Sequence, residues 1–288
     1  MSTEIKNPVV RFLVYGHVWL ALGAAAQVWW LGKVFFVEDK RLAGFAGCAT
    51  IAAYGAMRLW RLDKASATGN EPMAWFHVNR QWVALMVTAC AVSATVLVWP
   101  LLGKVLPALV LPGAIALLYV LPLRLTGGRI LGLRRIPYMK SLWTAGVWAA
   151  ISVLLPMAVD PDPPSTGLIT LLFLMQCCFV YALMIAFDIR DRSYDMASLR
   201  TLPQLLGDRW ARRASVVLIC LPALFLLWYG AASAHSDVWP IVLPVPAYLL
   251  GAVLLARATP QRPDTFYVLW LDGLLILVPV LAWVGTLL

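Results

Sequence analysis

The sequence predicts an all-α, polytopic membrane protein with about nine transmembrane helices bundled around a central cavity. Of the 288 residues, 62% are hydrophobic and only 13% are charged, whereas about 25% of an ordinary soluble domain is charged. The apolar residues form runs of about 20, the length at which an α-helix crosses a bilayer. No stretch of soluble-domain size interrupts these runs, so residues 1–288 are predicted to form a single transmembrane domain.

Five runs occur in the first 160 residues. The charged segment 37–41 separates the first run from the second, and the polar segment 61–81 separates the second from the third. The first run is long and has no small-residue cleavage site, so it is predicted to stay as a helix. The fourth run is the weakest, because three prolines interrupt it. The five runs are Val9–Phe36, Leu42–Trp60, Trp82–Leu101, Val105–Leu123 and Ser141–Val159.

Four more runs follow in the second half. The proline-rich turn 160–167 precedes the sixth run, and a charged segment, 188–213, separates it from the seventh. Clusters of polar residues or proline between apolar runs are typical of turns; the segment at 233–237 is polar, and the segment at 256–265 is polar and contains proline. The four runs are Leu168–Phe187, Ala214–Ala232, Val238–Leu255 and Phe266–Leu288.

The distribution of basic residues predicts the orientation. All but four of the 23 Lys and Arg residues fall in alternate connections, on the side of the N-terminus. This positive-inside pattern places the N-terminus in the cytoplasm, in a multi-pass protein of the cell inner (cytoplasmic) membrane. The net charge of +9 is therefore explained by basic residues that orient the protein in the lipid bilayer, and no nucleic-acid partner is predicted. The sequence identifies no protein partner.

Three carboxylates stand at the cytoplasmic end of the sixth run, in the segment AFDIRDRSYD. Charges beside a membrane helix are costly and therefore indicate a functional site. Their spacings of three and four residues place them within about 60° of one another on an α-helix. A cluster of oxygen ligands suits a hard cation, and Mg²⁺ commonly accompanies phosphate-bearing substrates. The three are Asp188, Asp191 and Asp195.

These residues resemble a known family. AFDIRDRSYD, together with LRTLPQLLG at 199–207, is similar to the second Asp-rich motif of the UbiA superfamily of intramembrane prenyltransferases and the segment after it. LRRIPYMKSLWTAGVW at 133–148 is similar to the start of that family's fifth helix, where a lysine reaches the substrate diphosphate. The layout of nine helices also fits, so the chain is identified as a divergent UbiA-like protein.

The resemblance implies an enzyme that ionises an allylic polyprenyl diphosphate with Mg²⁺ and transfers the prenyl group to a lipophilic acceptor, for which an aromatic compound is expected. Asp188, Asp191 and Asp195 would bind the metal. Lys140 and Arg134 would bind phosphate oxygens as these gain charge, which makes Asp188, Asp191 and Lys140 the predicted catalytic residues. Aromatic faces attract a carbocation, so Trp143 and Trp148 are candidate cavity residues, as is the lone acid Asp272 of the last run.

The chain departs from the family at the end of the second run. The family has a first Asp-rich motif there, whereas this chain reads AYGAMRLWRLD at 53–63. Tyr54, Arg58 and Arg61 share one helical face by the same arithmetic. Two readings remain open: the arginines, together with Tyr54, bind the diphosphate directly, or the arginines pair with the carboxylates and leave the site inactive.

Two other functions remain open. A UbiA-type terpene cyclase would act on the prenyl diphosphate without an acceptor. An ion-coupled transporter or lipid-binding membrane protein belongs to a different class. The absence of a clear inverted repeat, and the position of the acids near one membrane face, disfavour a transporter. The sequence does not separate transferase from cyclase.

Overall fold

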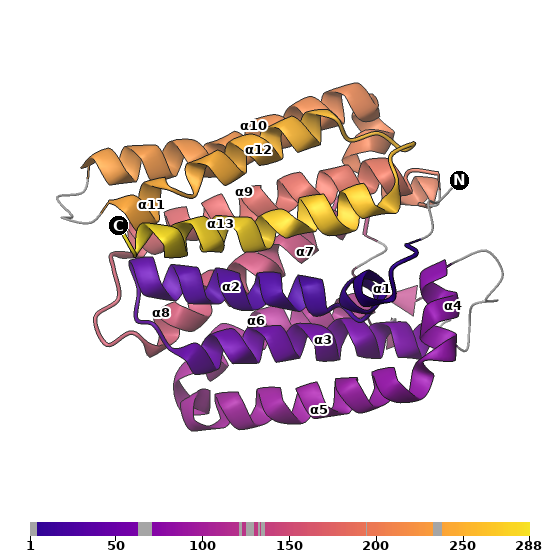
Figure 1. Ribbon diagram of the computed structural model, residues 1–288, viewed down its shortest axis with the longest axis horizontal. Coiled ribbons are helices and arrows are strands. Elements are labelled where there is room, and N and C mark those ends of the chain that lie inside the picture. The colour runs from indigo at the N-terminus through magenta and orange to yellow at the C-terminus, as the bar shows by residue number, and fades with distance from the viewer. Residues whose placement is uncertain are drawn as a thin grey trace.

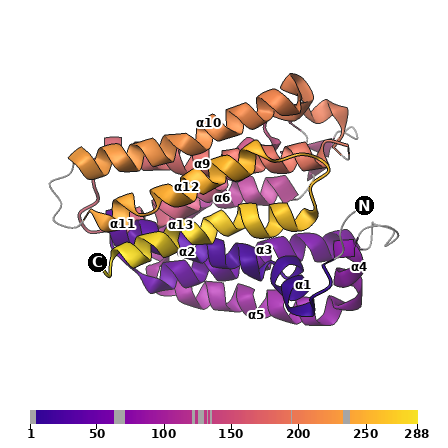
Figure 2. The same cartoon turned by 45° about the horizontal axis from the view of Figure 1, so that its top comes forward.

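A computed structural model describes residues 5–62, 71–120, 123–124, 130–131, 133, 136–193, 195–232 and 238–288. In these ranges the chain is a bundle of long helices that lie side by side, as Figures 1 and 2 show from two directions. The predicted all-α class is thereby confirmed; the strands are two paired residues each. The elements are α1 (Pro8–Tyr15), α2 (Val18–Phe35), α3 (Lys40–Leu62), α4 (Glu71–Val78), α5 (Arg80–Val98), α6 (Leu102–Val120), β1 (Leu123–Arg124), β2 (Ile130–Leu131), α7 (Lys140–Ala149), α8 (Leu155–Val159), α9 (Thr166–Asp191), α10 (Leu202–Ala232), α11 (Trp239–Val242), α12 (Val245–Ala256) and α13 (Asp272–Gly285), with 3₁₀ turns η1 (Trp99–Leu101) and η4 (Ala197–Leu199) and π-turns η3 (Ala150–Leu154) and η5 (Phe266–Leu271).

Eight helical stretches among the described residues are long and apolar enough to cross a membrane. One of them, Arg80–Tyr119, has 40 residues and contains both α5 and α6. Helix α1 and the end of α13 lie at opposite ends of the bundle (Figure 1), which requires an odd number of crossings. Counting α5 and α6 separately satisfies this requirement, and the number nine stays a prediction.

The first predicted run is two helices instead of one. Helix α1 ends at Tyr15, and α2 begins at Val18 after His17, whose φ of 61° is left-handed. The ring Nδ1 of His17 lies 2.6 Å from the carbonyl oxygen of Tyr15. The histidine ring therefore bonds to the backbone at the break, and such local hydrogen bonds compete with those of a continuous helix. The pattern of apolar residues does not reveal this competition.

Each long helix packs against one or more of the others. Helix α2 packs against both α3 and α13, α10 packs against α9 and α12, and α7 packs against α9. The π-turn η3 contacts α2, α6 and α9, and it leads directly into α8. Val153 and Leu155 there are completely buried. Apolar side chains thus fill the bundle interior around η3 and the start of α8.

A buried amide pair connects three of the helices. Gln27 of α2 donates from Nε2 to the carbonyl oxygen of Leu275 in α13 at 2.9 Å. Its Oε1 accepts a hydrogen bond of 3.1 Å from Nε2 of Gln176 in α9. Polar side chains within a membrane bundle are satisfied by neighbouring helices in this way. The outer surface is apolar instead, with Trp82 74% and Leu111 68% exposed, as expected where the solvent is lipid.

Helix α10 starts well before its predicted apolar run. It begins at Leu202 and contains one non-helical residue, Gly207, with φ 77° and ψ 161°. Glycine adopts such a backbone conformation without the strain that a Cβ would bring. The polar segment before Ala214 is therefore helical but bent, and the bend turns the first residues of α10 back towards the end of α9.

We expect Gly285→Ala to destabilise the fold. A Cβ at Gly285 would lie 2.6 Å from the carbonyl carbon and oxygen of Trp239 and 2.7 Å from the nitrogen of Pro240. These are backbone atoms, so the contact between α13 and α11 must open, at a cost of about 1–3 kcal/mol. Thermal unfolding in detergent should show a lower midpoint. Gly113→Ala is the control, since no atom lies within 4 Å of its Cβ, and a comparable loss there would contradict the packing.

Candidate functional site

The site lies where the start of α7 meets the end of α9. Two loops are joined just before it: the N–H of Tyr138 donates to the carbonyl oxygen of Leu199 at 2.9 Å. A guanidinium N–H of Arg200 donates to the Tyr138 hydroxyl at 3.0 Å. Both Tyr138 and Arg200 have left-handed φ values, 67° and 48°, a strained conformation that surrounding contacts must hold. This pairing fixes the residue that begins α7, Lys140.

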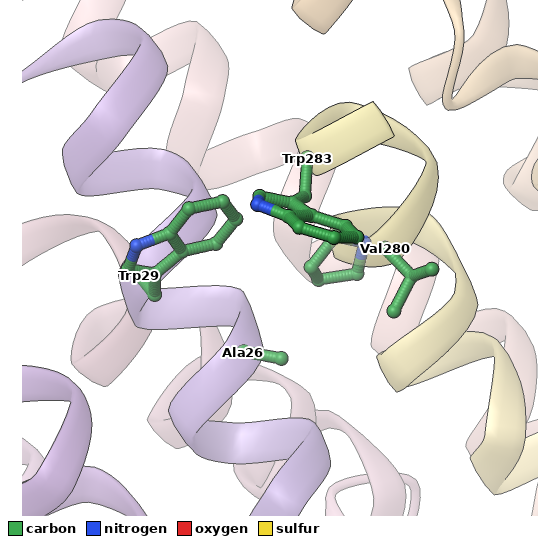
Figure 3. Close-up of a pocket in the computed structure, with 5 residues that line it drawn as sticks. Ala26, Trp29, Val280 and Trp283 are labelled. Carbon is green, nitrogen blue, oxygen red and sulfur yellow. The ribbon is translucent and has the colours of Figure 1, made fainter. Parts of the chain in front are cut away.

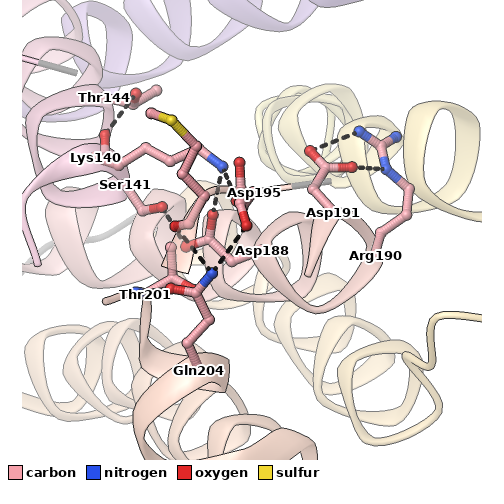
Figure 4. Close-up of polar contacts among 10 residues, drawn as sticks. Lys140, Ser141, Thr144, Asp188, Arg190, Asp191, Asp195, Thr201 and Gln204 are labelled. Carbon is pink, nitrogen blue, oxygen red and sulfur yellow. Dashed lines mark hydrogen bonds and ion pairs between the residues drawn. The ribbon is translucent and has the colours of Figure 1, made fainter. Parts of the chain in front are cut away.

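Lys140 stands between two carboxylates (Figure 4). Its Nζ lies 3.0 Å from Oδ1 of Asp188 and 2.5 Å from Oδ2 of Asp195. All three side chains are largely buried, with at most 13% exposure. Two carboxylates this close repel each other unless a cation lies between them. In this structure the ammonium of Lys140 is that cation, and the cluster keeps one net negative charge.

Neighbouring polar groups hold the two carboxylates in place. The Ser141 hydroxyl donates to Oδ2 of Asp188 in a short hydrogen bond. Gln204 Nε2 lies 3.3 Å from the carbonyl oxygens of Asp195 and Met196, and its Oε1 accepts from the N–H of Thr201. The start of α10 thus supports the segment that carries Asp195. Sequence reasoning did not identify Ser141 or Gln204, although Ser141 directly follows the predicted Lys140.

Asp191 points away from this cluster, towards η5 and α13 (Figure 4). Arg190 Nε donates to its Oδ1 at 2.7 Å, and a terminal nitrogen of Arg190 lies 3.2 Å from Oδ2. The same guanidinium lies over the rings of Phe187 and Tyr267, at 4.9 and 5.5 Å from their centroids, and 3.9 Å from Asp264. Arg190 therefore holds Asp191 outside the pair formed by Asp188 and Asp195.

The expectation that three carboxylates share one face of one helix is wrong in its geometry. Helix α9 ends at Asp191, so Asp195 belongs to the following turn and not to a fourth helical position. Among the residues described, no group of three or more Asp, Glu, His or Cys side chains is arranged to hold a metal ion. The metal role of Asp191 stays a prediction, and the structure brings together Asp188 and Asp195.

The donors present nevertheless fit Mg²⁺ through two carboxylates. Mg²⁺ is usually bound by one or two carboxylates, with water and substrate phosphate completing its octahedron. Asp188 and Asp195 already converge on one cationic atom, Lys140 Nζ. Nearby, the buried Thr201 hydroxyl has no hydrogen-bond partner in the described structure, and a metal-bound water would supply one. The fit requires Lys140 to leave its position between the carboxylates.

Helix α3 brings Tyr54 and Arg58 of the altered first motif close to other helices of the bundle. Trp148 Nε1 of α7 lies 3.5 Å from the Tyr54 hydroxyl, and the His17 ring meets the Tyr54 ring edge to face, with centroids 5.5 Å apart. Arg58, one turn further along α3, interacts electrostatically with His17 and Tyr54. Tyr54 thus lies within reach of α7 and His17, and its contact with the diphosphate stays a prediction.

The remaining predicted residues are placed as follows. The Trp143 Nε1 is buried without a hydrogen-bond partner in the described structure. Asp272 is the first residue of α13 and follows η5; it interacts electrostatically with Arg190 and Tyr54. Arg134 and the side chain of Arg61 lie outside the described residues.

A separate shallow depression lies between α2 and α13 (Figure 3). Its lining is almost entirely apolar and contains no ionisable side chain, so it does not suit a diphosphate. Trp29, in its wall, donates from Nε1 to Glu38 at 3.0 Å, which lowers the pKa of this carboxyl below its ordinary value. The lining residues are Ala26, Trp29, Pro279, Val280 and Trp283.

Comparison with known proteins assigns the fold. The structure is similar to the apo structure of a UbiA homologue from Aeropyrum pernix K1, with a TM-score of 0.62 and 17% identity over 94% of this chain and 97% of that one. It is also similar to a structure described as a digeranylgeranylglyceryl phosphate synthase in membranes, with a TM-score of 0.54 and 12% identity over 96% and 98% of the two chains. No curated protein sequence matches the chain. Residues 61–274 match the UbiA prenyltransferase family, so the chain, an integral membrane protein, belongs to the UbiA prenyltransferase family.

Proposed function

We propose that the protein is a Mg²⁺-dependent intramembrane prenyltransferase that ionises an allylic polyprenyl diphosphate and transfers its prenyl group to a lipophilic acceptor. The observation that carries the proposal is the buried cluster in which Asp188 and Asp195 converge on Lys140. It combines acidic groups for a cation with a cation for a phosphate. We further propose that residues 1–288 act as one domain, with the cluster on the cytoplasmic side of the inner membrane.

The proposed role of Lys140 is to exchange partners. Bound Mg²⁺ would supply electrostatic stabilisation of the departing diphosphate. Asp188 and Asp195 would hold the ion, and Asp191 would join them once Arg190 turns towards phosphate. The displaced ammonium of Lys140 would bind a phosphate oxygen, where its charge stabilises the leaving group. Ser141 keeps Asp188 oriented during this exchange, because its hydroxyl is fixed on the first turn of α7.

Arg58 is proposed to contact the diphosphate in place of the missing acidic motif. We expect Arg58→Ala to raise the KM for the allylic diphosphate by about tenfold or more, because a charge-assisted contact to phosphate is lost. The measurement is steady-state diphosphate release at several substrate concentrations. Arg209→Ala, at an exposed position on α10, is the control. An unchanged KM in a folded Arg58→Ala protein would return Arg58 to a structural role.

The experiment that tests the function is product analysis with the purified protein. It is incubated with geranyl, farnesyl and geranylgeranyl diphosphates and Mg²⁺, with and without aromatic quinone-precursor acceptors. A prenylated acceptor, formed only when both substrates are present, is expected. Hydrocarbon formed without acceptor would identify a terpene cyclase instead. No diphosphate release at any chain length, from protein of verified fold, would overturn the enzyme assignment.

A further inference from the structure

Asp272 is an acid inside a membrane helix that the diphosphate site does not use. It lies in the stretch Phe266–Gly285, which is apolar enough to span the membrane. Asp272 is half-buried, so part of the residue remains accessible. Trp270, two positions earlier on nearly the opposite face, is 64% exposed to the lipid side. Asp272 therefore lies on the side of the helix away from Trp270 and is not fully enclosed by packed atoms.

The carboxylate of Asp272 has no hydrogen-bond donor among the residues that the structure describes. Its electrostatic neighbours are the guanidinium of Arg190 and the hydroxyl of Tyr54. The guanidinium is already paired with Asp191 and stacked on two rings. An acid within a membrane bundle ordinarily pairs closely with another group. A carboxylate that has no such pair and is partly accessible is free to accept a proton from a bound molecule.

Local helix geometry supports a functional position. The π-turn η5 ends at Leu271, directly before Asp272, and the other π-turn of the described chain, η3, begins two residues after Trp148. Single π-turns within helices occur frequently at functional sites, because they redirect nearby side chains. Trp148 meets Tyr54, and Tyr54 interacts with Asp272. The two π-turns thus flank an aromatic and acidic group inside the bundle.

We propose that Asp272 accepts the proton released when the prenyl group is transferred, a role that rests on the proposed function. The C1–O bond of the allylic diphosphate breaks, and its electron pair leaves with the diphosphate. The acceptor then forms a bond to C1 with its own electron pair. Its bond to hydrogen breaks, the electron pair stays with the acceptor, and the proton passes to a carboxylate oxygen of Asp272. In an acceptor-free reaction a C–H bond next to the cationic carbon breaks. Its proton passes to Asp272, and the electron pair of the C–H bond forms the last C=C bond.

The test separates ionisation from product formation. Asp272→Asn keeps the shape of the side chain but removes the basic oxygen. Diphosphate release is expected to stay within about tenfold of the wild type, with water capturing the cation as prenyl alcohol. The ratio of coupled or cyclised product to released diphosphate should fall about 100-fold, the scale of general-base catalysis. Products are quantified by mass spectrometry and diphosphate by a coupled assay.

Asp264→Asn is the matched control, since Asp264 is a second acid near Arg190 and is 47% exposed. This variant should retain the wild-type ratio of product to released diphosphate. An unchanged ratio in Asp272→Asn, or equal loss of product and diphosphate in folded protein, would overturn the proposal. Absence of diphosphate release from the wild type would instead overturn the proposed function.

A second variant covers the case in which Asp272→Asn does not fold. Asp272→Ala leaves room for a small acid, and added formate is expected to restore coupled product in a concentration-dependent way. Formate should have no such effect on Asp264→Ala. Failure of formate to raise the product ratio in folded Asp272→Ala would contradict the proton-acceptor role.

Discussion

Replacing Asp188 by asparagine is expected to lower the rate of diphosphate release by about 10³-fold or more, as the loss of a central electrostatic group does in other enzymes. Asp188 is 3% exposed and contacts both Lys140 and Ser141. Asparagine keeps its size but cannot bind Mg²⁺ as an anion. The cluster becomes neutral, with Lys140 still paired to Asp195, so the fold should remain intact. Rate measurements and thermal unfolding check the two parts separately.

Asp208→Asn is the control for this substitution. Asp208 is also an acid paired with an arginine, Arg192, at 2.9 Å, and it lies outside the cluster, so its loss should change the rate by less than about twofold. Asp195→Asn should resemble Asp188→Asn. Asp191→Asn reports whether the third carboxylate joins the site, and a loss of about 100-fold is expected. Near wild-type rates in Asp188→Asn would refute the assignment of the cluster.

Replacing Lys140 by methionine should make the stability of the protein depend on Mg²⁺. The same substitution should also lower its activity. Without the ammonium, Asp188 and Asp195 face each other as uncompensated charges, and breaking a buried pair in this way costs about 3–5 kcal/mol. A divalent cation that binds only the folded state restores stability by mass action. The unfolding midpoint of Lys140→Met should therefore rise markedly with added MgCl₂. That of the wild type should change little, because Lys140 already occupies the position.

Activity of Lys140→Met should fall about 100-fold or more, because the leaving diphosphate loses a fixed cation. Lys33→Met is the matched control: Lys33, in the last turn of α2, pairs with Glu38 at 3.2 Å, is 45% exposed and does not belong to the cluster. Its midpoint should not respond to Mg²⁺ differently from that of the wild type. A Lys140→Met protein that is stable without metal and indifferent to Mg²⁺ would show that the two carboxylates do not form a cation site.

The fold class was predictable because a chain that crosses a membrane several times must have a high apolar content and apolar runs of about 20 residues. The apolar runs locate to within a few residues α3, and also the stretch formed by α11 and α12 together. The break at His17 and the early start of α10 were not predictable in this way, since each depends on single-residue backbone geometry. The π-turns η3 and η5 likewise leave no trace in apolar periodicity.

The site was predictable in its members more than in its pairing. Lys140 and Asp188 were both identified, and they meet although 48 positions (188 − 140) separate them. The spacing of the three carboxylates suggested a single face, but α9 ends at Asp191 and Arg190 draws that side chain to the other side. The orientation of Arg190 depends on tertiary contacts with Tyr267 and Asp264. The local sequence around Asp191 does not reveal these contacts.

Equilibrium binding of farnesyl thiolodiphosphate, an analogue that ionises poorly, tests the central claim most directly. The claim is that Asp188 and Asp195 exchange Lys140 for a Mg²⁺–diphosphate pair. Titration calorimetry of the wild-type protein in nanodiscs should show binding that requires Mg²⁺ and disappears with EDTA. Asp188→Asn should lose the Mg²⁺-dependent part, while Asp208→Asn keeps it. Binding of equal strength with and without Mg²⁺, or unaltered binding to Asp188→Asn, would contradict the account.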